Sequence, residues 1–185
     1  MPSPIAHALA GFAGGWIVAP APAADRGGNR SRTYRRVLLF GAAGAAADID
    51  LLFHAHSGPT HGLASAVVAG AIVWCAITWA ARRGSGNEWG ASAVITAGAV
   101  AFAYASHTLL DWLGSDTSPP IGIMAGWPFS RDYYQSPLHV FMAISRRYWL
   151  PEFWTGNLRA LVRELIILLP VVTAAVLLRR GRTRY

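Results

Sequence analysis

A long stretch without formal charge is the feature that most restricts how this chain can fold. Residues 51–81 contain no Asp, Glu, Lys or Arg, and residues 91–113 contain only Asp111. Each stretch has about the ~20 residues that a helix needs to cross a bilayer. The chain is 54% hydrophobic and 14% charged, with a mean hydropathy of +0.34. This balance favours a membrane protein over the alternative of a soluble helical protein with a large core.

Five apolar segments are predicted to span the membrane. They are residues 4–24, 37–53, 61–81, 91–113 and 158–178. Pro20 and Pro22 predict that the first helix ends early. The second segment is short and ends in acidic residues, so one arm of a re-entrant hairpin is an alternative. Abundant Gly and Ala permit close helix packing in lipid. We therefore predict an all-α, multi-pass helical bundle of about five spans, one domain over residues 1–185, with a long extracytoplasmic loop at 114–157.

The distribution of positive charge predicts the orientation of these spans. The net charge of +7 comes from 16 Arg residues, since the chain has no Lys. Most of them fall in residues 25–36, 82–90 and 179–184, which share one face of a five-span bundle. The positive-inside rule makes that face cytoplasmic, so the C-terminus is predicted to be cytoplasmic and the N-terminus extracytoplasmic. Because the Arg residues flank apolar segments, we interpret them as topology signals and predict no nucleic-acid partner.

Six ionisable residues lie at the ends of the predicted spans that face the extracytoplasmic side. They are His7, Asp48, Asp50, His61, His107 and Asp111. Ionisable residues within or near a membrane are costly and are usually kept for function. Nitrogen and oxygen donors in this mixture suit a metal centre, most simply zinc. The sequence therefore predicts a metal site on the extracytoplasmic side.

Spacing within the two pairs gives their members different expected roles. His107 and Asp111 are four residues apart, which on a helix places both side chains on one face, within reach of one ion. Asp48 and Asp50 are two residues apart and would point in nearly opposite directions on a regular helix. Only one of these two is therefore expected to bind metal directly, unless the helix breaks there. The other could orient a ligand or accept a proton.

Several stretches of the chain resemble the membrane-bound metal-dependent hydrolase family. They are PSPIAHALAG, AAADIDLLF, HSGPTHG, SHTLLDWLGSD and GWPFS, in this order within residues 1–135. One member of that family is a LexA-regulated inner-membrane protein. The family is distantly similar to zinc-dependent phospholipase C and to fungal single-strand nucleases, helical enzymes that hydrolyse phosphoesters with clustered zinc ions. The resemblance implies a metal-dependent hydrolase embedded in the inner membrane.

The resemblance also implies which residues bind metal. The expected ligands are His7, Asp48, His61, His107 and Asp111. Asp111 would bridge one ion to a second ion bound by His7, so one or two zinc ions are expected, with other divalent metals as alternatives. The sequence AAAD favours Asp48 over Asp50 as the ligand. Asp50 or His56 is then the candidate catalytic residue that accepts a proton.

The aromatic-rich loop at 114–157 is the predicted substrate region. Its aromatic residues are expected either to anchor the loop at the membrane interface or to form a lid that admits a lipid headgroup. Arg131 is the candidate phosphate clamp, because a guanidinium holds phosphate oxygens in pairs, and His139 is a second candidate for substrate binding. The predicted function is hydrolysis of a lipid-linked phosphoester. Alternatives are a non-catalytic metal-binding protein or transporter, and prenyl-diphosphate chemistry other than hydrolysis.

Overall fold

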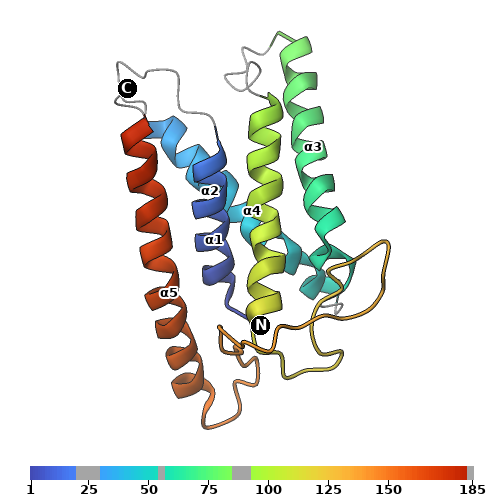
Figure 1. The fold of residues 1–185 in the computed structure, drawn as a ribbon, viewed down its shortest axis with the longest axis vertical. Coiled ribbons are helices and arrows are strands. Elements are labelled where there is room, and N and C mark those ends of the chain that lie inside the picture. Colours follow the sequence, from blue (N-terminus) through green and yellow to red (C-terminus); the bar gives the residue numbers. More distant parts are fainter. Residues whose placement is uncertain (20–29, 54–56, 85–92, 183–185) are drawn as a thin grey trace.

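The computed structural model describes residues 1–19, 30–53, 57–84 and 93–182. Five α-helices run through these ranges: α1 Pro4–Val18, α2 Arg30–Ala45, α3 Leu63–Arg82, α4 Ala93–Leu113 and α5 Phe153–Arg182 (Figure 1). Two 3₁₀-helices, η1 Ala46–Phe53 and η2 Pro59–His61, lie between α2 and α3. The described ranges contain isolated β-bridges but no β-strand. The all-α prediction is therefore confirmed.

Three of the helices are long and apolar enough to cross a membrane. They are α3, α4 and α5, while α1 is apolar but shorter, at 15 residues. Many apolar side chains on α3 and α5 point away from the protein: Val67 is 68% exposed, Ile72 63% and Ile166 68%. Such surfaces are stable against lipid rather than water. The chain thus has the helices of a membrane protein, and the count of five spans remains a prediction.

The second predicted span consists of two different helices. The α-helix α2 begins at Arg30, before the apolar residues 37–53, and ends at Ala45. The chain then tightens into the 3₁₀-helix η1, which carries Asp48 and Asp50. Short polar residues such as Asp disfavour the interior of an α-helix because they bond to nearby backbone. The change from α-helix to 3₁₀-helix thus occurs in the part of the chain that contains Asp48 and Asp50.

Helix α1 lies against α2, α4 and α5, and α3 packs on α4 (Figure 1). Glycines allow α1 and α2 to approach at backbone distance: a Cβ atom added to Gly11 would lie 2.5 Å from the Cα atom of Gly44. Only a residue without a side chain fits such a crossing. The close approach places the first turns of α1 beside the end of α2.

Residues 114–152 form an irregular segment below the end of the bundle where α4 ends and α3 and α5 begin (Figure 1). Backbone hydrogen bonds attach it to the helices: Ser136 N–H donates to the Trp112 carbonyl at 2.8 Å, and Leu63 N–H donates to the Ala125 carbonyl at 3.1 Å. The predicted loop at 114–157 is shorter in the structure because α5 already begins at Phe153.

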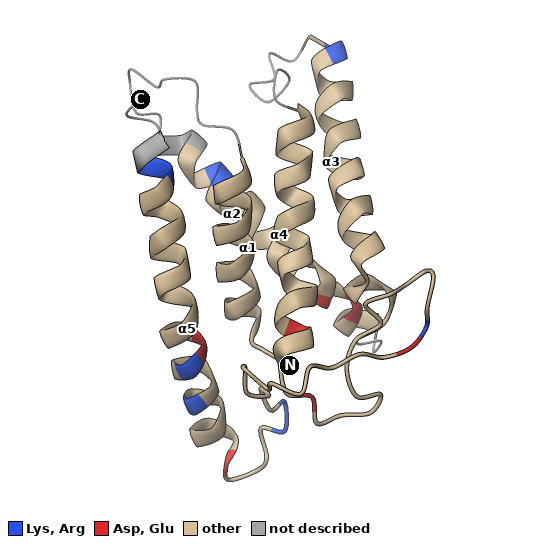
Figure 2. Ribbon diagram, in the orientation of Figure 1, with Lys and Arg blue, Asp and Glu red and all other residues tan. Residues whose placement is uncertain are grey.

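The charged residues are unevenly distributed between the two ends of the bundle (Figure 2). The described acidic residues gather toward the end formed by η1, the end of α4 and the start of α5, whereas Arg residues mark the C-terminal ends of α3 and α5. Arg131, Arg146 and Arg147 on the segment 114–152 lie at the acidic end, as do Arg159 and Arg163 near the start of α5. The C-terminal ends of α3 and α5 thus carry Arg residues, as the predicted orientation requires, but Arg residues also occur at the opposite end.

Candidate metal centre

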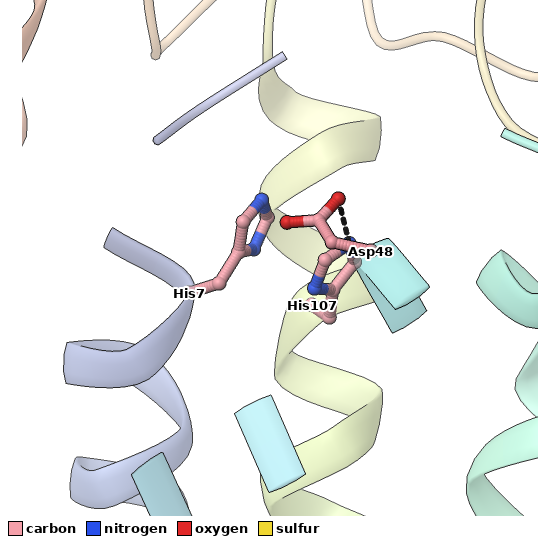
Figure 3. Close-up of side chains that lie close together, drawn as sticks. All are labelled: His7, Asp48 and His107. Atoms are coloured by element: carbon pink, nitrogen blue, oxygen red, sulfur yellow. Dashed lines mark ion pairs between the residues drawn. The ribbon is translucent and has the colours of Figure 1, made fainter. Parts of the chain in front are cut away.

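Four elements bring the five predicted ligands together. Helix α1 contributes His7, η1 contributes Asp48, η2 contributes His61, and α4 contributes His107 and Asp111. One donor atom each from His7, Asp48 and His107 lies within 4.8 Å of the others, and the same holds for His61, His107 and Asp111. Figure 3 shows the first of these groups, with the Asp48 carboxylate beside the His107 ring. Residues from distant parts of the chain thus converge at one place.

Four donor atoms are spaced like the ligands of one tetrahedral ion. His107 Nε2 lies 3.0 Å from Asp111 Oδ2 and 3.6 Å from Asp48 Oδ1. His61 Nε2 lies 3.3 Å from Asp111 Oδ2 and 3.9 Å from Asp48 Oδ1. Ligands at usual zinc bond lengths are about 3.4 Å apart in a tetrahedron. The four contacts range from 3.0 to 3.9 Å and so bracket this spacing, which allows these donors to hold one zinc ion.

The second oxygen of Asp111 faces a different histidine. Asp111 Oδ1 lies 3.2 Å from His7 Nε2, and the His7 ring stacks on the His107 ring with 3.6 Å between centroids. Among the described residues, the Asp111 carboxylate contacts three imidazoles and no Arg. Its two oxygens thus point to two adjacent positions, as in a carboxylate that bridges two ions.

Buried polar atoms without a hydrogen-bond partner support the fit to a cation. Within the described part of the chain, His107 Nε2 and both carboxylate oxygens of Asp111 are buried and form no hydrogen bond. Burying a polar group without a partner costs roughly 1–3 kcal/mol, and more for a charged group. A divalent cation bound among these atoms would remove that cost. The donors present therefore fit zinc, a metal that histidine and carboxylate commonly bind.

Hydrogen bonds on the outer ring nitrogens orient two of the three histidines. His107 Nδ1 lies 2.8 Å from the Gly44 carbonyl oxygen, which can only accept, so Nδ1 carries the proton and Nε2 presents its lone pair. His61 Nδ1 lies 3.2 Å from Asp50 Oδ2, and the Thr60 hydroxyl donates to the same oxygen at 2.7 Å. Metal-binding histidines are usually held in this way.

The electrostatic field at His61 favours positive charge. Burial disfavours the charged form of the ring, but the carboxylates of Asp111 and Asp50 outweigh burial and raise the pKa of His61 to about 9. Opposite charges at such distances stabilise a buried cation far more than they would in water. A metal ion held by Asp48 and Asp111 would experience the same field.

One of the five candidate ligands remains partly accessible. The side chains of His61, His107 and Asp111 are 0% exposed and that of His7 is 1% exposed, whereas the Asp48 side chain is 17% exposed. The cluster is therefore closed on the sides of α1 and α4 and reachable beside η1. A catalytic metal site needs such an opening for water or substrate.

The other predicted site residues are not among the clustered donors that the structure describes. Asp50 lies behind His61, on its outer nitrogen, and His56 lies outside the described residues. Arg131 and His139 are exposed on the segment 114–152, and neither side chain has a contact with the cluster among the described residues. Their predicted role in substrate binding thus stays a prediction.

Several residues that support the cluster were missed from sequence. The Thr108 hydroxyl donates to the His61 carbonyl at 2.9 Å, and the Tyr104 hydroxyl donates to the Thr60 carbonyl at 2.7 Å. Thr60 and Thr108 are each adjacent in sequence to a candidate ligand, and this position could have indicated their supporting role. The role of the Gly44 carbonyl could not be predicted in this way, because every residue has a backbone carbonyl.

A family model described as YdjM inner membrane protein matches residues 1–182. No curated protein and no solved structure matches the chain. The match agrees with the inner-membrane location and with the LexA-regulated membrane protein that the sequence resembles. Hydrolase activity and metal dependence, which the resemblance also implied, are not part of that description.

Proposed function

The chain belongs to the YdjM inner membrane protein family, and from this premise we propose that it is a metal-dependent hydrolase acting on a lipid-linked phosphoester at the extracytoplasmic face. The observation that carries the proposal is the convergence of three His and two Asp side chains, nearly all buried, at one end of the helices. A purely structural site would not need so many donors, since a structural zinc ion takes four ligands.

Each residue of the cluster has a distinct role in the proposal. Asp48, His61, His107 and Asp111 would hold one zinc ion, and Asp111 with His7 would hold a second. Such ions supply Lewis acidity and positive charge for the phosphoryl oxygens. Asp50 would orient His61 through the contact at Nδ1, and its predicted part in proton transfer stays a prediction. Other divalent metals that accept nitrogen and oxygen donors are compatible with this set.

The position of the cluster supports a lipid headgroup as the reacting group. The cluster lies where α3 begins and α4 ends, which is the depth of the headgroups if these helices cross the bilayer. Tyr148 is 74% exposed, Trp149 67% and Trp154 77%, and exposed Tyr and Trp favour the membrane interface. Arg131 and His139, on the segment between α4 and α5, remain the candidates for contact with a phosphorylated headgroup.

Metal content is the first test of this proposal. Purified protein is expected to contain one or two zinc ions per chain by elemental mass spectrometry, and His107→Ala and Asp111→Ala are each expected to lose them. His139→Ala is the matched control for metal content, because His139 is exposed and outside the cluster. Wild-type metal content in both cluster variants would overturn the proposal.

Turnover is the second test, and it separates the proposed enzyme from the alternatives. Metal-loaded protein in vesicles is expected to release phosphate or a phosphorylated headgroup from a panel of phospholipids and prenyl phosphates. Release should stop in Asp111→Ala. Bound metal without release from any substrate of the panel would favour a non-catalytic metal-binding protein. Prenyl-diphosphate chemistry other than hydrolysis, such as prenyl transfer, would instead release inorganic diphosphate and leave the prenyl group joined to another acceptor.

A further inference from the structure

Helix α5 packs on the rest of the protein along one stripe that carries two charged residues. The buried side chains of this stripe are Ala160, Glu164, Leu168, Ala175 and Arg179. Glu164 is 1% exposed and Arg179 is 8% exposed. Charged residues are almost never buried without a specific partner, so each of these two requires an explanation.

Glu164 binds Ser3, the residue that precedes and caps α1. The Ser3 N–H donates to Glu164 Oε1 at 2.7 Å, and the Ser3 hydroxyl donates to Glu164 Oε2 at 2.5 Å. The same hydroxyl accepts the Ala6 N–H at 3.1 Å and so caps the first turn of α1. A carboxylate at this position also interacts favourably with the positive end of the helix dipole. Glu164 therefore fixes where α1 begins.

Ser3 is in turn linked directly to a candidate metal ligand. The Ser3 carbonyl accepts the N–H of His7 at 3.1 Å, across the first turn of α1. His61 and His107 have their outer nitrogens at Asp50 and at the Gly44 carbonyl, but His7 Nδ1 forms no hydrogen bond within the described residues. Because no hydrogen bond from the described residues holds its outer nitrogen, the position of the His7 ring depends on the backbone of α1.

From these contacts we infer that Glu164 is a positioning residue for His7, acting through Ser3 and the first turn of α1. The inference rests on the proposed function, because it gives His7 the role of a metal ligand. It assigns to a carboxylate on α5 the task that Asp50 and the Gly44 carbonyl perform for the other two histidines. Loss of the Glu164 charge is therefore expected to weaken metal binding at His7 in a protein that still folds.

The other charged residue of the stripe provides a matched control. Arg179 donates to the Trp16 carbonyl near the C-terminal end of α1, and its guanidinium carbon lies 4.5 Å from the centroid of the Trp16 ring. This contact joins the same two helices at the end away from the metal ligands. Arg179→Gln and Glu164→Gln each remove one buried charge from the α1–α5 interface, but only Glu164 lies beside the turn that carries His7.

Cobalt(II) is the probe for the metal centre, because its visible absorption reports the ligand geometry. Glu164→Gln is expected to change the absorption of the cobalt-loaded protein and to weaken cobalt affinity about 10–100-fold, as for other residues that orient metal ligands. Ser3→Ala is also expected to change the absorption and to weaken cobalt affinity. If Glu164→Gln does not fold, Ser3→Ala provides the test in its place. Arg179→Gln should keep the wild-type spectrum. Equal changes in Arg179→Gln and Glu164→Gln would show a general loss of packing and overturn the inference.

A second measurement does not depend on metal binding. Metal-free protein is treated with diethyl pyrocarbonate, and modification of His7 is followed by mass spectrometry of its peptide. His7 is 1% exposed, so slow modification is expected in the wild type and in Arg179→Gln, with a several-fold increase in Glu164→Gln and Ser3→Ala. Unchanged modification in these two variants overturns the inference. Absence of cobalt binding by the wild type would instead count against the proposed function alone.

Discussion

Asp48 and Asp50 are separated by one residue but have different environments. Asp48 is partly exposed and faces the inner nitrogens of His61 and His107, whereas Asp50 is 6% exposed and lies at the outer nitrogen of His61. The 3₁₀ geometry of η1 turns the two carboxylates toward opposite sides of His61. The two acidic residues can therefore serve one metal site in different ways. Asp48 would bind the metal directly, and Asp50 would orient the ligand His61.

Asp50→Asn is expected to weaken zinc affinity about 10–100-fold while leaving the number of bound ions at saturation unchanged. The carboxylate holds the Nδ1 proton of His61 and makes Nε2 a better ligand, and an amide does this less well. Competition with a fluorescent chelator measures the affinity. Asp48→Asn is the comparison, and it should lower the number of bound ions. If Asp50→Asn lost the metal completely, Asp50 would be a ligand itself.

The contact between α1 and α2 determines the geometry of the site at the level of whole helices. A Cβ atom added to Gly44 would clash with the His7 carbonyl and would lie 2.7 Å from the Cα atom of Gly11. The Gly44 carbonyl also accepts the hydrogen bond from His107. One glycine thus lets two helices meet and orients a candidate ligand on a third.

Gly44→Ala is expected to destabilise the protein by about 1–3 kcal/mol, because the added methyl group has only backbone atoms to displace. The fall in Tm, followed in detergent by circular dichroism, measures this effect. Gly98→Ala on α4 is the control, since a Cβ atom there would meet nothing within 4 Å. A Tm for Gly44→Ala no lower than that of Gly98→Ala would contradict the close helix contact.

The whole molecule has an acidic end that carries the candidate metal centre and an opposite end that carries the Arg residues of the C-terminal parts of α3 and α5 (Figure 2). Five Arg residues at the acidic end reduce this difference without removing it: Arg131, Arg146, Arg147, Arg159 and Arg163. The predicted orientation therefore depends on how the Arg residues are divided between the two ends, because the positive-inside rule counts Lys and Arg and gives little weight to acidic residues.

Single cysteines test this orientation. In a Cys75→Ala background, Ser118→Cys at the acidic end should react with a membrane-impermeant maleimide in intact cells, because Ser118 is exposed on the segment after α4. Ser85→Cys, in the connection between α3 and α4, should react only after the cells are opened. Labelling of both positions from outside would contradict the prediction, and the reverse pattern would place the metal centre on the cytoplasmic side.

The sequence by itself determined the helical, membrane-embedded class and the residues of the candidate metal centre. Apolar runs and the spacing of His107 and Asp111 depend on local helix geometry, which is the same in any fold. Tertiary structure decided the rest: the position of Asp50 behind His61, the Gly44 carbonyl at His107, and the contact of Glu164 with Ser3, 161 residues away. These features depend on how separate helices meet, and no local spacing in the chain encodes that geometry.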